Sequence, residues 1–337
     1  MNTLPLGKLP SELLAKILTQ APISDPRVVL GPGIGLDCAV VDIGDSYLVF
    51  KSDPITFATD EIGWYAVQVN ANDIATTGAT PRWFMVTALL PEGVTTPKGV
   101  EEISKQLFSA CQDLGISLIG GHTEITYGLD RPILVGTMIG EVPRDQLVTP
   151  KGATPGDHIL LTKGVPIEGT AILAREFPER LKGVLSQEEI QEASDYLFNP
   201  GISVVRDAVI ATQAGKVTAM HDPTEGGLSG ALWELAEACG HTLVIDPKNV
   251  FIPQISTKIC QAFEIDPLAT IASGALLLTT PPEQVDGIIQ SLEKEEITCA
   301  DIGCVEAGNV RVEQITPKGR QLLPRPERDE IAKLFER

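Results

Sequence analysis

Apolar positions along the chain follow two spacings, one typical of strands and the other of helices. Short apolar runs at residues 28–30, 39–41 and 47–50 predict strands, and the Gly44-Asp45 turn between the last two predicts a β-hairpin. Farther along, apolar residues at helical spacing alternate with more short apolar runs as far as residue 313. Strands and helices that alternate in this way predict an α/β or α+β fold with two domains.

The predicted elements fall on either side of a segment rich in Pro and Gly at residues 149–157, which we interpret as the connection between two domains. We therefore expect an N-terminal domain at residues 1–150, a C-terminal domain at 151–325 and a tail at 326–337. In the N-terminal domain we expect helices at 11–18, 59–77 (with Thr59 as N-cap and Asp60 and Glu61 in the first turn) and 100–114, and further strands at 83–90, 116–119 and 133–139. In the C-terminal domain we expect strands at 159–161, 217–220, 242–245, 275–278, 300–305 and 309–313, and helices at 168–176, 186–197, 202–213, 228–239, 255–263 and 282–293.

The net charge restricts the partners that the chain can have. Its 337 residues include 26 Lys and Arg against 45 Asp and Glu, which gives a formal charge of −19. An acidic protein repels nucleic acid and anionic membranes, so we expect neither as a partner. No apolar run approaches the roughly 20 residues that span a bilayer, and we find no signal peptide. The six cysteines form no C-x-x-C pair, which favours reduced thiols in a cytoplasmic protein.

The segment from Met220 to Gly230 combines carboxylates and glycines ahead of a predicted helix. Free N–H groups at the start of a helix bind anions such as phosphate, and the carboxylates of Asp222 and Glu225 beside such a site would bind Mg²⁺. The alternative is an ordinary capping loop in which Asp222 or Thr224 is only the N-cap. The segment alone leaves both interpretations open.

Acidic residues also lie beside predicted strands in the first half of the chain. Asp37 precedes the strand at 39–41, and Asp53 follows the strand at 47–50. On the next helix, Asn70, Asp73 and Thr77 are spaced so that they share one face. That face is either the solvent side of the helix or the wall of a polar site.

A pair of glycines, Gly120 and Gly121, follows the strand predicted at 116–119, and His122, Thr123 and Glu124 come directly after it. Most glycine pairs form turns, so this motif needs support from the rest of the chain. The chain has no phosphate loop of the form G-x-x-x-x-G-K-[ST]. Several carboxylates beside small residues are what a Mg²⁺–triphosphate site needs when that loop is absent.

A dinucleotide-binding site of the Rossmann type is not expected. The glycines at positions 31, 33 and 35 resemble its fingerprint, but a strand is predicted after them. That fingerprint requires a helix, because the helix N-terminus binds the pyrophosphate.

Taken in order, these motifs resemble the aminoimidazole-ribotide (AIR) synthase-related superfamily, and the resemblance extends from about residue 28 to residue 325. Within the superfamily the chain is most similar to the HypE family of hydrogenase-maturation proteins. The matching segments are Gly35-Leu-Asp37, Ser52-Asp53, Asn70-Ala-Asn-Asp73, Gly120-Gly-His-Thr-Glu124, His221-Asp222-Pro-Thr-Glu225 and Leu323-Pro-Arg325.

The resemblance implies a two-domain PurM-like fold, with an N-terminal domain that dimerises and binds Mg·ATP and a C-terminal α/β domain that faces the substrate. The residues that it implies as metal ligands are Asp37, Asp53, Asp73 and Glu124. The residues that it places near the nucleotide are Asn70, Asp73, Gly120, Gly121, His122 and Thr123. Lys51 could also pair with phosphate, and the alternative is an ordinary surface lysine. Asp222, Glu225 and His221 would serve the substrate, and His221 could instead be structural.

The chemistry implied by the resemblance is ATP-dependent phosphorylation of an oxygen on a small substrate or carrier. Two features depart from the HypE family. No cysteine follows Cys304, so a thiocarbamate cannot be carried on a C-terminal thiol, and Leu36 replaces an acidic residue. The alternatives are therefore a non-catalytic, ATP-binding dimeric scaffold in hydrogenase maturation and a phosphotransferase like thiamine-monophosphate kinase.

Overall fold

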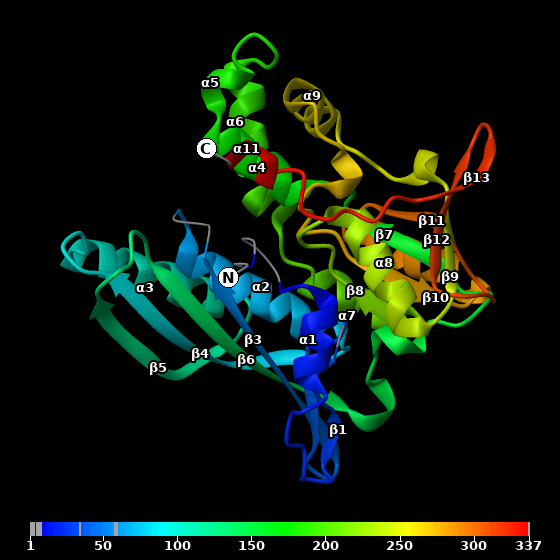
Figure 1. Cartoon of the computed structure of the whole chain (residues 1–337), viewed down its shortest axis with the longest axis horizontal. Helices are drawn as coiled ribbons and strands as arrows, with labels where there is room; N and C mark the ends of the chain where they lie inside the picture. The colour runs from blue at the N-terminus through cyan, green and yellow to red at the C-terminus, as the bar shows by residue number, and fades with distance from the viewer. Residues whose placement is uncertain (1–3, 5–8, 34, 57–59, 336–337) are drawn as a thin grey trace. The chain divides into compact units, whose positions relative to one another are not determined.

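The computed structural model describes every residue except 1–3, 5–8, 34, 57–59 and 336–337 (Figure 1). The chain divides into two compact units. The first unit consists of Pro22–Pro32 and Asp37–Leu147, and the second of Met1–Ala21, Gly33–Leu36 and Val148–Arg337. The helix α1 (Ser11–Leu18) therefore groups with the second unit, whereas we expected it in the N-terminal domain.

A six-stranded sheet in the order β1-β2-β3-β6-β4-β5 forms the first unit. Its neighbouring strands are antiparallel except for β4 and β5, which are parallel, and β2 and β3 form the predicted hairpin. Among the described residues β5 pairs only with β4, so it is an edge strand. The strands are β1 (Val28–Leu30), β2 (Ala39–Asp42), β3 (Ser46–Ile55), β4 (Thr80–Pro91), β5 (Ser117–Thr126) and β6 (Ile133–Pro143).

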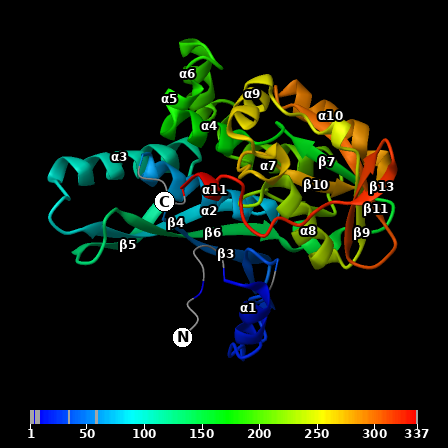
Figure 2. The ribbon, with the colours of Figure 1, turned by 45° about the horizontal axis from the view of Figure 1, so that its top comes forward.

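Two helices, α2 (Ile62–Thr76) and α3 (Pro97–Asp113), cover one face of this sheet (Figure 2). Nearly every residue of α2 is buried, so this helix is the centre of the core. The helix begins later than we predicted: Asp60 and Glu61 precede its first turn, and Thr59 lies outside the described residues. It ends just before Gly78, as predicted, because the positive φ of that glycine suits the residue after a helix.

The strand β5 is longer than the sequence predicts, and this changes the meaning of the glycine motif. We expected Gly120 and Gly121 to follow a strand at 116–119, but both glycines lie inside β5. In the parallel pairing, Gly121 lies opposite Val86 of β4. A Cβ atom at Gly121 would lie 2.0 Å from the Val86 carbonyl oxygen, so the glycine permits a close approach of two strands.

A seven-stranded sheet in the order β13-β12-β9-β11-β7-β10-β8 forms the second unit. We did not predict β13, a short hairpin partner of β12, because its four residues are all exposed and have no alternating apolar pattern. The strands are β7 (His158–Thr162), β8 (Ala219–His221), β9 (Thr242–Ile245), β10 (Leu277–Thr280), β11 (Cys299–Glu306), β12 (Arg311–Thr316) and β13 (Gly319–Leu322).

The helices of the second unit separate into two hydrophobic clusters. In the main core, Leu228, Leu232 and Leu235 of α8 pack with residues of β7, β9 and β10. A smaller cluster joins α4, α5, α6 and α9 and includes Ile331 of the tail, so the tail is part of the packed unit. The helices are α4 (Ile167–Glu176), α5 (Pro178–Leu181), α6 (Gln187–Asp195), α7 (Val205–Ala214), α8 (Gly227–Cys239), α9 (Gln254–Phe263), α10 (Val285–Lys294) and α11 (Ala332–Phe335).

None of the helices in the described residues has both the length and the apolar composition that crossing a bilayer requires.

Candidate functional site

A lysine surrounded by three carboxylates lies in the first unit. The Nζ atom of Lys51 is 3.1 Å from an oxygen of Asp73, 3.3 Å from one of Asp53 and 3.9 Å from one of Asp37. The lysine side chain is only 10% exposed. We refer to these four residues as the Lys51 cluster.

Three different elements supply the Lys51 cluster. Lys51 and Asp53 are two residues apart on β3 and therefore point to the same face of the sheet. Asp73 lies on α2, the helix packed against that face, and Asp37 lies just before β2. The structure thus brings together three of the four predicted metal ligands, and it places the predicted nucleotide-binding Lys51 between them.

Asn70 holds β3 against α2. Its side-chain oxygen accepts a hydrogen bond from the backbone N–H of Asp53 at 3.0 Å, and its amide nitrogen donates to the carbonyl of Ala66 at 2.9 Å. Gly136 of β6 leaves room for this contact, because a Cβ atom there would lie 2.4 Å from the Asn70 amide nitrogen. Asn70 is fully buried and positions Asp53. The predicted polar face of α2 is therefore not its solvent side, since Asp73 and Thr77 are buried too.

Charge keeps Lys51 protonated. Burial by itself would lower the pKa of the Lys51 ammonium, but the negative charges of Asp73, Asp37 and Asp53 together outweigh it and raise that pKa above its ordinary value. The Lys51 cluster therefore contains one positive charge whose position is fixed by the fold.

A bound Mg²⁺ does not fit the Lys51 cluster as its side chains stand. The carboxylate oxygens are suitable ligands for a hard cation, but the ammonium of Lys51 lies within 4 Å of all three carboxylates. In the described part of the chain, no group of three or more His, Cys, Asp or Glu side chains is arranged to hold a metal ion.

Glu124, the fourth predicted metal ligand, lies away from the Lys51 cluster. The pairing of strands places Asp53 opposite Gly136, Gly136 opposite Val86, and Val86 opposite Gly121. Three strand spacings of about 4.8 Å therefore separate Asp53 from the glycine motif on β5, about 14 Å in all. Within one chain Glu124 cannot share an ion with Asp53.

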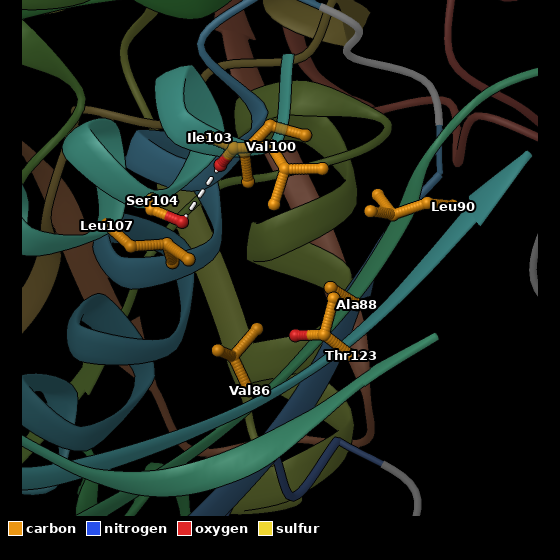
Figure 3. A pocket seen from close by; sticks show the side chains of 8 residues that line it. All are labelled: Val86, Ala88, Leu90, Val100, Ile103, Ser104, Leu107 and Thr123. Atoms are coloured by element: carbon orange, nitrogen blue, oxygen red, sulfur yellow. Dashed lines mark hydrogen bonds between the residues drawn. The ribbon is translucent and has the colours of Figure 1, made fainter. Parts of the chain in front are cut away.

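We refer to Gly120, Gly121, His122, Thr123 and Glu124 as the β5 motif. All five residues are exposed at the edge of the sheet. His122 and Glu124 are on the same face, and the His122 Nε2 atom lies 3.2 Å from a Glu124 carboxylate oxygen. Thr123 instead lines a small hollow between β4, β5 and α3 (Figure 3). At about 40 Å³ this hollow has room for a few water molecules and not for a nucleotide.

The acidic loop of the second unit follows β8, as predicted. His221 ends β8 and is buried, with its Nε2 atom 2.8 Å from a carboxylate oxygen of Glu234 on α8. Asp222 is buried directly after it, and Glu225 is exposed. The His221–Glu234 contact joins the strand to the helix, which supports the structural interpretation of this histidine.

The N-terminus of α8 is occupied by a carboxylate from the tail. The residue before the helix is Gly226 in a left-handed conformation, so neither Asp222 nor Thr224 is the N-cap. The Gly226 N–H donates a hydrogen bond to Asp329 Oδ2 at 2.7 Å, and the Ile331 N–H donates to the other oxygen at 2.9 Å. The N–H group that we expected to be free for a phosphate therefore has a partner in the same chain.

A buried glutamate near this loop was not predicted. Glu168, at the start of α4, is 6% exposed, and its Oε2 atom has no hydrogen-bond partner among the described residues. Burial raises the pKa of Glu168 to about 7, the Ser273 hydroxyl opposes this shift, and the charges of Glu225, Asp329 and Asp222 add to it. No sequence signal joins Glu168 to residues so distant along the chain.

A buried ion pair in the second unit was also not predicted from the sequence. The Nζ atom of Lys163 lies 3.1 Å from a carboxylate oxygen of Asp207, and both side chains are buried. The Thr162 hydroxyl donates a hydrogen bond to Asp207 at 2.7 Å. This pair ties the end of β7 to α7.

Both halves of the chain match one protein family. Residues 35–142 match the N-terminal domain of AIR synthase related proteins, and residues 154–315 match the C-terminal domain. The chain is 27% identical to a putative hydrogenase expression/formation protein of Methanocaldococcus jannaschii, with 97% of each chain covered. It is 26% identical to the carbamoyl dehydratase HypE of Azotobacter vinelandii, with coverage of 93% of this chain and 89% of that protein.

Solved structures share the fold. The hydrogenase maturation protein HypE in complex with ATP superposes with a TM-score of 0.71 at 24% identity, covering 93% of this chain and 90% of that one. AaThiL complexed with AMPPCP and TMP superposes with a TM-score of 0.73 at 19% identity, covering 94% of each chain.

Proposed function

Because this chain belongs to the AIR synthase-related family, we propose that it is an ATP-binding enzyme that phosphorylates an oxygen atom of a small substrate or of a carrier protein. The observation that carries the proposal is the Lys51 cluster, which lies in the unit that matches the N-terminal domain of the family. Solved proteins with this fold hold ATP or AMPPCP, which supports a nucleotide as the ligand.

In the proposed complex the triphosphate of ATP binds next to the Lys51 cluster. Three carboxylates surround the one ammonium of Lys51, so this ammonium would attract the phosphates only once the Mg²⁺ that accompanies ATP offsets the excess negative charge. Asn70 keeps Asp53 in place by accepting a hydrogen bond from the Asp53 backbone N–H. Mg²⁺ that enters with ATP would neutralise phosphate charge in the transfer step. Asp37 and Asp73 keep Lys51 charged, so the lysine remains an electrostatic group throughout.

The β5 motif takes a different role in the proposal. Because β5 is an exposed edge strand about 14 Å from Asp53, its Gly120, Gly121, His122, Thr123 and Glu124 do not complete the Lys51 cluster in the same chain. We propose that two copies of the chain pair through the first unit, where an open strand edge favours association. Pairing at this edge would place the β5 motif at the interface between the two copies.

The second unit supplies groups for the substrate. Asp222 and Glu225 lie in one loop, and Glu168, whose raised pKa is about 7, is a proton donor near neutral pH. His221 orients this loop through Glu234. The six cysteines are free, which suits the cytoplasm as the place of action.

A second candidate function is a non-catalytic, ATP-binding scaffold in hydrogenase maturation. It is favoured by Leu36, which stands where the resemblance to the HypE family implies an acidic metal ligand. Substrate-dependent release of ADP separates the two candidates: an enzyme releases it and a scaffold does not.

The experiment that tests the proposal measures ATP binding by calorimetry in the full-length chain with Mg²⁺ present. We expect binding in the wild type and a loss of at least tenfold in affinity in Asp73→Asn. The matched control is Asp113→Asn, which changes an exposed aspartate on α3 of the same unit and should bind ATP like the wild type. Absence of ATP binding in the folded wild type, or equal binding in Asp73→Asn, would contradict the proposal. Light scattering of the same samples tests pairing, since the proposal requires the mass of a dimer.

A further inference from the structure

We propose that Lys51 is the resident cation of its carboxylate cluster and takes the place of a divalent metal ion in the nucleotide-free protein. This inference concerns the protein before any nucleotide binds, so it goes beyond the proposed function and does not depend on it. Asp37, Asp53 and Asp73 are predicted metal ligands, but the structure places the Lys51 ammonium among them.

The first support is the position of the ammonium. A metal ion bound by Asp37, Asp53 and Asp73 would lie at the point where their carboxylates converge. Lys51 Nζ lies at that point, 3.1 to 3.9 Å from an oxygen of each. A Mg²⁺ ion needs its oxygen ligands at 2.0 to 2.1 Å, so the ammonium and the ion compete for one volume and repel each other.

The second support is that the carboxylates are held in place without a metal. Asp73 lies on the fully packed helix α2, and its backbone carbonyl accepts a hydrogen bond from the Cys38 thiol at 3.3 Å. The Asp53 backbone is fixed by Asn70. The fold therefore brings the three carboxylates together, and one internal positive charge reduces their mutual repulsion.

The third support is the anchoring of Lys51 itself. It lies in the middle of the ten-residue strand β3, opposite Met138 of β6. Its side chain is only 10% exposed, so leaving the cluster would move a buried stem as well as the ammonium. A divalent ion arriving alone from solvent would have to displace this group.

The test is a titration of the nucleotide-free, full-length protein with Mn²⁺. Electron paramagnetic resonance measures the concentration of free Mn²⁺ at each step of the titration. We expect that the wild type has no Mn²⁺ site that depends on Asp73, so Asp73→Asn should not change its Mn²⁺ binding. Lys51→Met keeps the length and apolar character of the stem while removing the charge, and we expect it to gain one Mn²⁺ site at least tenfold tighter than any site of the wild type. The double variant Lys51→Met/Asp73→Asn should lose that site again.

Two controls keep the result specific. Lys51→Arg preserves the positive charge and should gain no Mn²⁺ site, and Lys105→Met removes an exposed lysine of α3 and should behave like the wild type. A wild-type Mn²⁺ site that disappears in Asp73→Asn overturns the proposal, as does a folded Lys51→Met variant that gains no site. If Lys51→Met does not fold, the comparison of the wild type with Asp73→Asn decides by itself.

The result is independent of ATP binding. A wild type that binds ATP and also has an Asp73-dependent Mn²⁺ site without nucleotide would refute this inference and leave the proposed function standing. A wild type with neither ATP binding nor a Mn²⁺ site would refute the function and support the inference.

Discussion

The carboxylate of Asp329 caps helix α8 through the backbone N–H of Gly226, 103 residues away in the sequence. Helix N-terminal N–H groups attract negative charge, and here the tail of the same chain supplies it. The same carboxylate also accepts from Ile331, which packs with the cluster around α4 and α9. One side chain thus joins the tail to the acidic loop and to a hydrophobic cluster.

Removing this carboxylate should destabilise the second unit. Asp329→Ala leaves the N–H groups of Gly226 and Ile331 without their acceptor, and an unsatisfied buried donor costs about 1–3 kcal/mol. We expect a reduced free energy of unfolding in urea denaturation. Glu327→Ala, at an exposed position two residues earlier, is the control and should change little. Equal stability of the two variants would mean that the Asp329 cap does not form in solution.

The stability of the protein should depend on pH through Glu168. The pKa of this carboxyl is raised from 4.5 to about 7, chiefly by burial, so the folded state binds its proton more tightly than the unfolded state. The stabilisation that proton binding to Glu168 adds to the free energy of unfolding is fully present below about pH 4.5. It is lost as the pH rises through 7, which is a change of about 3 kcal/mol.

Glu168→Gln cannot ionise and should lack this dependence. We expect the unfolding free energy of the wild type, measured relative to this variant, to fall between pH 5 and pH 8. Urea denaturation at several pH values measures the difference. A difference that stays constant over this range would show that the Glu168 pKa is not raised.

The buried pair of Lys163 and Asp207 gives a third prediction. Asp207→Ala leaves the Lys163 ammonium buried without its charge partner and removes the acceptor of the Thr162 hydroxyl, so we expect a loss of about 3–5 kcal/mol. A double variant, Lys163→Met/Asp207→Leu, removes both charges and should recover part of that loss. Thermal unfolding of the three proteins measures it. If the double variant is less stable than Asp207→Ala, desolvation of the lysine is not the cause.

The two neighbouring glycines of β5 provide a matched test of the parallel pairing. Gly121 has a positive φ of 150° and faces the Val86 carbonyl, so Gly121→Ala should cost at least 2 kcal/mol, the scale of overpacking with backbone strain. Gly120 has open space around it, so Gly120→Ala should be nearly neutral. Thermal unfolding distinguishes the two. Similar losses in both variants would contradict the strand pairing described here.

Much of the fold could be predicted from apolar spacing. The hairpin of β2 and β3, the buried helix α2 and the helix α8 all have clear apolar patterns, and each forms close to its expected place. The extension of β5 through Gly120 and Gly121 could not be predicted in this way. Glycines carry no side chain to show strand alternation, and the residues that follow them are polar because the strand lies at an exposed edge.

The candidate site could be predicted only in part, because sequence motifs identify its acidic residues but not the contacts between them and Lys51. The acidic residues Asp37, Asp53 and Asp73 could be identified from motifs, but the partner of all three is a lysine that the motifs describe only as a phosphate contact. Its position two residues before Asp53 on one strand is a signal that could have been used. The contacts of Asp329 and Glu168 join distant parts of the chain, and no local pattern contains them.

The protonation of Lys51 has a consequence for chemical reactivity. Acylating reagents attack the free amine of a lysine, and the three carboxylates keep Lys51 in its ammonium form within a buried setting. Lys98 and Lys105 of the first unit are exposed, so an acylating reagent in solution can reach them. The amine of Lys51 is therefore a poor nucleophile in the folded protein. Amine labelling should modify Lys51 last among the lysines of the first unit.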